Sequence, residues 1–158
     1  MCTIQKYKRQ YHDKLLQFLE ICLPQSGRCF ELNGRHKMYK DVSEYFEHFW
    51  CLFDGEDMIG TVALKKLDSD KCELKSLYLL EQYHKKGLGR LLLNTAIQEA
   101  RRNGYGTMYL DTLSSSKRAV HLYEKAGFPW NNSITYALYI AWLVVMIFLF
   151  IAPFKSDQ

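Results

Sequence analysis

The sequence lacks the cysteine patterns that indicate a disulfide framework or a structural zinc site. The five cysteines, Cys2, Cys22, Cys29, Cys51 and Cys72, are odd in number, and no two of them have CxxC spacing. Scattered thiols are typical of a reducing compartment, so we expect a cytoplasmic protein without a metal site. The N-terminal residues contain no apolar segment of the kind found in cleaved secretory signals.

Strong charge of either sign is also missing. The 21 Lys and Arg residues exceed the 17 Asp and Glu residues by 4. No basic stripe is present, so nucleic acid is not an expected partner. Apolar residues make up 48% of the chain and charged residues 24%, which excludes a disordered chain. The length of 158 residues favours one domain and is sufficient for a hydrophobic core.

One long segment has no ionisable side chain. The 29 residues from Ala126 to Phe154 contain no Asp, Glu, Lys, Arg or His, and Ile134–Ala152 is an apolar run of 19 residues. As a helix this run would span roughly 28 Å, close to the hydrocarbon thickness of a bilayer. Trp130, Tyr136 and Tyr139 lie near one end, as interfacial aromatic residues do. Residues 134–152 are therefore a candidate membrane anchor.

Two other interpretations of the apolar segment stay open. The run can form buried strands or a dimer-forming segment, which makes a homodimer compatible with the sequence. It can also be a non-native end of the domain, for example after a change of reading frame. Residues 129–158 are therefore treated as a segment separate from residues 1–128.

Residues 1–128 alternate between strand and helix patterns, which predicts an α/β layered fold. In the Gly87–Arg102 helix we expect Leu88, Leu91, Leu92, Ala96 and Ala100 on the apolar face, and we expect Pro24 to stop the first helix. The expected strands are Cys2–Lys8, Phe49–Phe53, Met58–Leu67, Cys72–Leu80 and Thr107–Leu113. The expected helices are Tyr11–Leu23, Met38–His48, Gly87–Arg102 and Ser116–Ala126.

A basic, glycine-rich turn connects a strand to the helix that begins near Gly87. The free amides and the dipole of a helix N-terminus favour a phosphate or pyrophosphate group there. Lys85, Lys86 and Arg90 would add positive charge. Neither the P-loop pattern nor the third glycine of GxGxxG is present. Taken alone, the turn could also be a solvated basic cap.

Two segments resemble the GNAT superfamily of N-acetyltransferases. HKKGLGRLLL, after ELKSLYLL, is similar to the acetyl-CoA motif of that superfamily, and SKRAVHLYEKAGF (Ser116–Phe128) is similar to its Asn-x-x-Ala-x-x-Leu-Tyr-Glu-Lys-x-Gly-Phe segment. The resemblance covers about residues 1–128. It implies a mixed, mostly antiparallel twisted sheet flanked by helices, and transfer of an acetyl group from acetyl-CoA to a primary amine.

The resemblance also assigns roles to individual residues. Strand residues would pair with the pantetheine arm, and a backbone amide there would polarise the thioester carbonyl. Tyr123 would protonate the leaving CoA thiolate; its alternative role is ordinary core packing. Implied cofactor-binding residues are Leu77, Tyr78, Leu79, His84, Lys85, Lys86, Gly87, Leu88, Gly89, Arg90 and Ser116.

Three departures from the family pattern stand out. His84 replaces the usual Arg or Gln and can donate to phosphate from one ring nitrogen when neutral. Ser116 replaces Asn; it can cap the helix but reaches less far toward CoA. The apolar segment replaces two amphipathic strands that normally complete the sheet, which would leave an open edge.

The acceptor amine must lose a proton, because an alkylammonium has a pKa near 10.4. We expect Glu73 to act as the base, on one strand face with Lys75, Leu77 and Leu79. The alternative is a surface Glu73 paired with Lys75 or Lys65, and Asp111 is the second candidate base.

The residues expected to wall the acceptor site are Arg28–Tyr39. Their mixed charge does not select between a polyamine, an amino acid, a drug or a peptide amine. A non-catalytic acyl-CoA-binding sensor and a membrane-tethered interaction module are the alternative functions.

Overall fold

The computed structural model describes residues 1–110, 112, 116–128 and 136–139. Within them, one six-stranded sheet has the strands in chain order, and only β4 and β5 run parallel. This confirms the predicted mixed, mostly antiparallel α/β fold. The strands are β1 (Cys2–Lys6), β2 (His48–Asp54), β3 (Asp57–Lys66), β4 (Lys71–Leu79), β5 (Thr107–Leu110) and β6 (Tyr136–Tyr139). The α-helices are α1 (His12–Gln25), α2 (Val42–Tyr45), α3 (Leu88–Arg102) and α4 (Lys117–Lys125).

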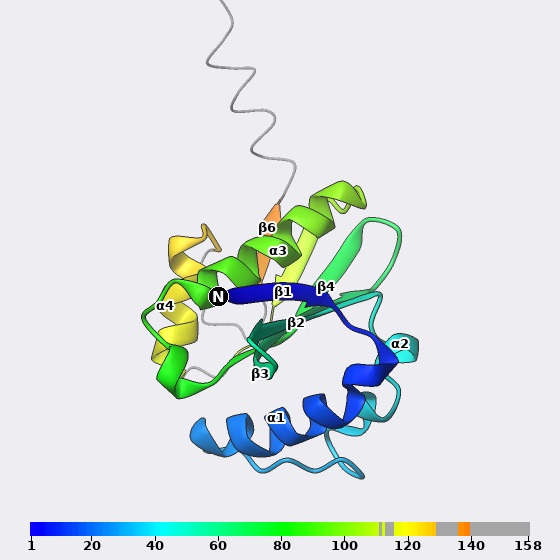
Figure 1. Ribbon diagram of the computed structural model, residues 1–158. Helices are drawn as coiled ribbons and strands as arrows, with labels where there is room; N and C mark the ends of the chain where they lie inside the picture. The colour runs from blue at the N-terminus through cyan, green and yellow to red at the C-terminus, as the bar shows by residue number, and fades with distance from the viewer. Residues whose placement is uncertain (111, 113–115, 129–135, 140–158) are drawn as a thin grey trace, which may run out of the picture.

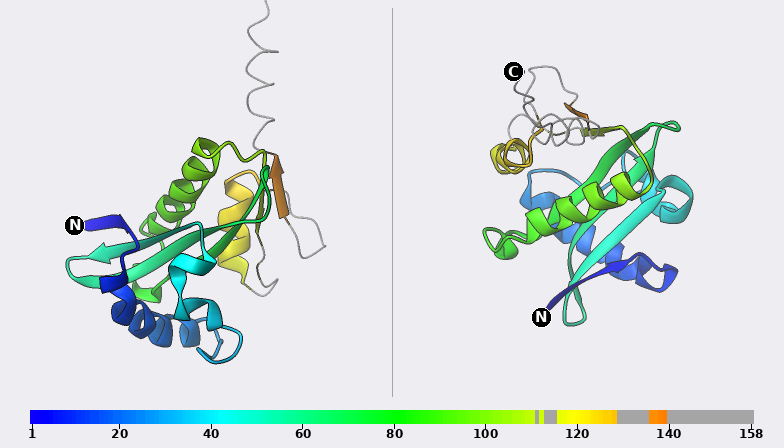
Figure 2. Two further views of the ribbon diagram at one scale, coloured as in Figure 1. Left: turned by 90° about the vertical axis from the view of Figure 1, so that its right-hand side faces the viewer. Right: turned by 90° about the horizontal axis from the view of Figure 1, so that it is seen from above.

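Helices cover both faces of the sheet, with α1 and α3 on opposite sides (Figure 1). Along β2, Trp50 and Leu52 belong to the core on the α3 side, whereas Phe49, Cys51 and Phe53 belong to the core on the α1 side. This alternation is the period of two of a strand that is buried on both faces. The sheet is therefore the middle layer of three. Its described end beyond β5 is β6, next to α4 (Figure 2).

The second predicted helix, Met38–His48, is wrong over most of its length. The structure has a 3-10 turn, η2 (Lys37–Lys40), then the single turn α2, and β2 begins at His48. Asp41 separates the two turns because its extended backbone ends the first, while its side chain accepts a hydrogen bond from the Glu44 N–H at 3.1 Å and caps the second. Two further 3-10 turns are η1 (Arg9–Tyr11) and η3 (Glu81–Tyr83).

Two details of the long helices also need correction. Pro24 lies within the last turn of α1, which continues to Gln25, and does not stop the helix. Leu91 is 45% exposed and is not part of the apolar face of α3. Leu92, Ala96 and Ala100 are buried as expected, and Leu93, Ile97 and Glu99 are buried as well.

For the apolar run Ile134–Ala152, a membrane-spanning helix and strands were both open interpretations, and the described part of the run is a strand. Tyr136–Tyr139 forms β6, which pairs antiparallel with β5, so these residues extend the sheet. Among the described residues, no helix is both long enough and apolar enough to cross a membrane. The other residues of the apolar segment lie outside those that the structure describes.

Candidate active site

A bulge divides β4 into two parts. Lys75 lies opposite Ala63 and Tyr78 lies opposite Thr61, so β4 carries one residue more than β3 between these pairs. Ser76, at the bulge, has a positive φ of 54°, which L-residues rarely adopt. The extra residue reverses the faces to which later side chains point.

This reversal corrects the predicted position of Glu73. Leu77 and Leu79 pack against the core on the α3 side, whereas Tyr78 packs against the core on the α1 side. Glu73 and Lys75 precede the bulge and therefore share the α1 side with Tyr78, not with Leu77 and Leu79. The prediction failed because strict alternation was continued through the bulge.

Two hydroxyl groups hold the bulge in place. The Tyr39 and Ser76 hydroxyl oxygens are 2.6 Å apart, and the Thr61 hydroxyl donates to the Ser76 carbonyl at 2.7 Å. Tyr39 is 1% exposed and Thr61 is fully buried. Burial raises the pKa of Tyr39 well above its usual value, so its hydroxyl stays protonated. Tyr39 was expected only as part of the acceptor wall, and Thr61 was assigned no role from the sequence, although it is a polar residue between apolar neighbours in β3.

Beyond the bulge, β4 has an edge that pairs with no strand among the described residues, called the free edge below. The last β4–β5 pair is Leu74 with Leu110, and β4 continues to Leu79. Over the described residues, Lys75–Leu79 therefore pair with β3 but not with β5. Leu77, Tyr78 and Leu79 are only half-buried, although they are apolar and belong to a central strand. Their backbone groups and side chains are available to an extended ligand that lies between the two strands.

The glycine-rich turn leads from this edge to the N-terminus of α3. Lys85 and Gly87 have positive φ values of 62° and 77°, and Gly87 is the residue before the helix. The first helical hydrogen bond of α3 runs from the Leu91 N–H to the Gly87 carbonyl, at 3.0 Å. The amides of Leu88, Gly89 and Arg90 precede that bond, so they can donate to an anion.

The turn and the first turn of α3 also carry basic side chains. Lys85, Lys86 and Arg90 are all exposed, and the Lys86 ammonium lies 5.0 Å from the centre of the Tyr83 ring. A Cβ on Gly89 would meet only Leu122 Cδ2 at 3.6 Å, which is an ordinary contact. Gly89 is therefore not required by packing among the protein's own atoms, which agrees with a role in close approach of a ligand.

The ring of His84 is fully engaged within the protein. Its Nε2 lies 2.9 Å from the Leu79 carbonyl oxygen, and its Nδ1 lies 2.6 Å from an Arg118 guanidinium nitrogen. Because the carbonyl can only accept and guanidinium can only donate, Nε2 donates to Leu79 and Nδ1 accepts from Arg118. No ring N–H remains for phosphate. His84 instead connects β4 to α4 through Arg118, which sequence reasoning missed although it lies within the SKRAV motif.

Ser116 and Tyr123 are the predicted site residues at α4. Ser116 precedes the helix, but its side chain makes no capping hydrogen bond, which corrects the expected role; its carbonyl accepts the Val120 N–H at 3.1 Å. Tyr123 is 7% exposed and packs against Phe128, with ring centres 6.1 Å apart. Burial, with a smaller contribution from Tyr78, raises the pKa of Tyr123, so it is a protonated phenol at neutral pH.

Glu73 makes the ion pair that the sequence left as an alternative. Its carboxylate lies 2.7 Å from the Lys75 ammonium, and the two side chains are 19% and 30% exposed. Asp111, the second candidate base, lies outside the described residues. The carboxylate is thus oriented by Lys75 on the face of β4 that also carries Tyr78.

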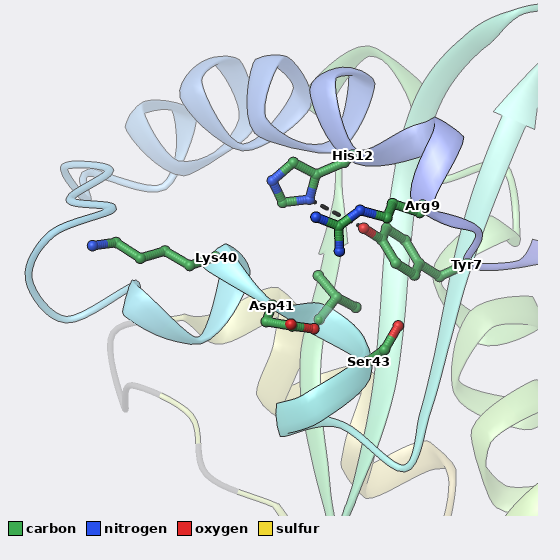
Figure 3. Close-up of a pocket in the computed structure, with 7 residues that line it drawn as sticks. Tyr7, Arg9, His12, Lys40, Asp41 and Ser43 are labelled. Carbon is green, nitrogen blue, oxygen red and sulfur yellow. Dashed lines mark hydrogen bonds between the residues drawn. The ribbon is translucent and has the colours of Figure 1, made fainter.

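A small polar pocket lies apart from these residues, between the start of α1 and α2 (Figure 3). Within it, the Tyr7 hydroxyl oxygen and His12 Nδ1 are 3.1 Å apart. It contains none of the residues predicted for the site. Its lining residues are Tyr7, Arg9, His12, Lys40, Asp41, Val42 and Ser43.

A free strand edge beside an anion-binding helix N-terminus defines a domain that holds a long ligand with a phosphate at one end. With a buried phenol nearby, these are the features of an acetyl-CoA-binding acetyltransferase domain. The sequence model of the Acetyltransferase (GNAT) family matches residues 13–128. The chain belongs to the GNAT family of acetyltransferases.

Individual relatives agree with this assignment. The uncharacterized N-acetyltransferase YjgM of Escherichia coli is 34% identical over 105 residues, which are 65% of this chain and 61% of the relative. YsnE of Bacillus subtilis, also an uncharacterized N-acetyltransferase, is 34% identical over 84 residues, which are 52% and 56% of the two chains. The chain thus spans less than two thirds of the length of these curated relatives.

Solved structures share the fold at low sequence identity. A GNAT-family acetyltransferase from Staphylococcus aureus has a TM-score of 0.76 at 19% identity, covering 87% of this chain and 98% of that one. The PaiA N-acetyltransferase of Thermoplasma acidophilum, crystallised with coenzyme A, has a TM-score of 0.72 at 19% identity, covering 87% and 96%.

Proposed function

We propose that this chain transfers the acetyl group of acetyl-CoA to a primary amine. The observation that carries the proposal is the free edge of β4 beyond the Ser76 bulge, which leads directly into the open amides at the N-terminus of α3. These parts fit an acyl thioester with a pyrophosphate. Leu88, Gly89 and Arg90 amides, with Lys85 and Lys86, would hold the pyrophosphate, and Leu77–Leu79 would pair with the pantetheine arm.

The chain's own residues account for the proton transfers. Acetyl-CoA supplies an acetyl group activated as a thioester, and a backbone amide after the bulge polarises the carbonyl that the amine attacks. As the carbon–nitrogen bond forms and the carbon–sulfur bond breaks, Tyr123 gives its phenolic proton to the leaving sulfur. Glu73, oriented by Lys75, takes a proton from the acceptor nitrogen through water.

A binding titration and a transfer assay test the proposal together. Calorimetry with acetyl-CoA at two salt concentrations should show binding that weakens with salt, because the pyrophosphate is held by charge. CoA thiol release, measured with a panel of primary amines, should fall about a hundredfold or more in Tyr123→Phe and in Glu73→Gln.

Tyr11→Phe is the matched control, because it removes only a surface hydroxyl bonded to Gln5. Binding of acetyl-CoA without amine-dependent thiol release would contradict the proposal and identify the sensor alternative. If turnover were unchanged in both Tyr123→Phe and Glu73→Gln, other residues would act as the general acid and the general base.

A further inference from the structure

Arg28 has a fixed position at the end of α1. The Gly27 N–H donates to the Pro24 carbonyl at 2.9 Å, and the Arg28 N–H donates to the Leu23 carbonyl at 3.1 Å. Gly27 has the positive φ of 72° that this pair of bonds requires. The arrangement is a Schellman motif, so the direction in which the chain leaves α1 is set by backbone hydrogen bonds.

The Arg28 side chain reaches the part of the site that lies beyond the bulge. Its guanidinium carbon is 6.0 Å from the centre of the Tyr78 ring, and Tyr78 is two residues after Ser76. Burial raises the pKa of Tyr39 and of Tyr123, and the Arg28 charge acts in the opposite direction on both. Arg28 is thus within electrostatic reach of the hydroxyl that holds the bulge and of the proposed general acid.

Two carboxylates, one in the expected acceptor wall and one on β4, are already paired with other cations. Glu31 lies 3.5 Å from the Arg35 guanidinium, and Glu73 lies 2.7 Å from the Lys75 ammonium. Within residues 1–110, 112, 116–128 and 136–139, the Arg28 side chain has no ion pair and no hydrogen bond, only the π face of Tyr78. A half-buried guanidinium with five donors thus lies over the Tyr78 ring and has no anionic partner in the part of the chain that the structure describes.

We propose that Arg28 binds the carboxylate of the acceptor, so that the acceptors are primary amines that also carry a carboxylate, amino acids being the simplest. This inference rests on the proposed function and names its substrate class. Guanidinium binds carboxylate through two parallel hydrogen bonds, and Tyr78 keeps its plane oriented. The same charge disfavours a polyamine, which would bring a second cation beside Arg28. The half-buried Tyr78 ring supplies an aromatic surface for an apolar side chain.

The first test measures binding without turnover. Protein saturated with CoA is titrated by calorimetry with N-acetyl-L-phenylalanine and with the amide of the same compound. The acid should bind about tenfold more tightly or better, because the amide loses a charge-assisted hydrogen bond. Arg28→Gln should remove the difference, Arg28→Lys should retain part of it, and Arg101→Gln, which removes an exposed charge from the last turn of α3, should leave it intact.

The second test measures transfer. Thiol release from acetyl-CoA is compared for L-phenylalanine and its amide, and for 6-aminohexanoate and its amide, which place the carboxylate further from the amine. At least one acid should exceed its amide in kcat/KM in the wild type, and Arg28→Gln should lower kcat/KM for that acid alone. Amides that react as well as both acids would overturn the inference and leave the proposed function standing. An acid preference in binding, without transfer to any probe, would support the anion site and overturn the proposed function.

Discussion

The two sides of the β4 free edge are constructed in different ways. The side toward α3 presents backbone amides, in a turn whose two positive φ angles are at Lys85 and Gly87. The side toward α1 is built from side chains of separate segments: Arg28 lies over the Tyr78 ring, and the buried Tyr39 bonds to Ser76 at the bulge. Backbone binding requires glycines at fixed spacing, which a motif records. Side-chain binding requires only that distant residues meet, which leaves no pattern in the sequence.

The largest effect is expected from removing the hydrogen bonds that hold the Ser76 bulge, because the two sides of the edge meet at the bulge. Tyr39→Phe combined with Thr61→Val removes both hydrogen bonds to Ser76. We expect kcat to fall by up to about a hundredfold, because the amide after the bulge loses its position, while the affinity for acetyl-CoA changes little. Unfolding free energy should fall by about 1–3 kcal/mol for each buried group left without its partner.

Thr95→Val is the matched control, because the Thr95 hydroxyl only donates to the Leu91 carbonyl on the exposed side of α3. Stopped-flow turnover and urea denaturation separate the two effects. If the double variant were destabilised but kept its kcat, Tyr39 and Thr61 would have a structural role alone.

A smaller effect is expected from a substitution on the α3 side of the edge, where backbone amides would bind the ligand. In Gly89→Ala the added methyl group fits against Leu122, and no positive φ is required there, so unfolding free energy should stay the same or rise slightly. The affinity for acetyl-CoA should nevertheless fall about tenfold, because the methyl group occupies the approach to the helix amides. Calorimetry and thermal denaturation measure the two quantities.

Gly104→Ala should show the opposite pattern. Gly104 has a φ of 77° after the end of α3, so the substitution should cost about 1–2 kcal/mol of stability and leave acetyl-CoA affinity unchanged. Wild-type affinity in Gly89→Ala would contradict the assignment of this helix N-terminus to the pyrophosphate.

The sequence was sufficient for the parts of the fold that depend on local patterns. The hairpin of β2 and β3 follows from alternating apolar residues around Asp54 and Gly55, and α3 follows from its apolar spacing and its basic, glycine-rich start. The bulge at Ser76 could not be predicted, because the side chains that bond to it, Tyr39 and Thr61, are distant in sequence.

The errors have the same physical origin. Glu73 was placed on the face of Leu77 and Leu79 because one extra residue in β4 leaves no composition signal. The engaged ring of His84 depends on Arg118, which only the packing of α4 brings close. At Tyr136–Tyr139 the apolar run was compatible with a membrane helix or with strands, and only the pairing with β5 decides for a strand. In each case tertiary contacts decided what local sequence left open.

The smallest expected effect concerns pH and belongs to the acceptor side. His36 is 7% exposed, and its Nδ1 accepts the Glu31 N–H at 3.0 Å. Burial, assisted by Arg35, lowers the pKa of His36, so below about 6.5 the unfolded chain binds a proton that the folded chain resists. Stability from His36 is therefore complete above that pH and is lost as the pH falls, with a slope of at most about 1.4 kcal/mol per pH unit.

Urea denaturation between pH 5.5 and 7.5 measures this slope, and His36→Asn should flatten it, whereas the same substitution at the exposed His121 should not. Because the His36 ring stacks on Tyr39 at 6.3 Å, its protonation should loosen the loop that carries Arg28 and Tyr39. The KM for a carboxylate-bearing amine should then rise below pH 6.5, while the Kd for acetyl-CoA, which depends on backbone amides and lysines, should not follow. If both constants changed together, the two sides of β4 would respond as one unit, and the distinction between a backbone-built and a side-chain-built half of the site would be wrong.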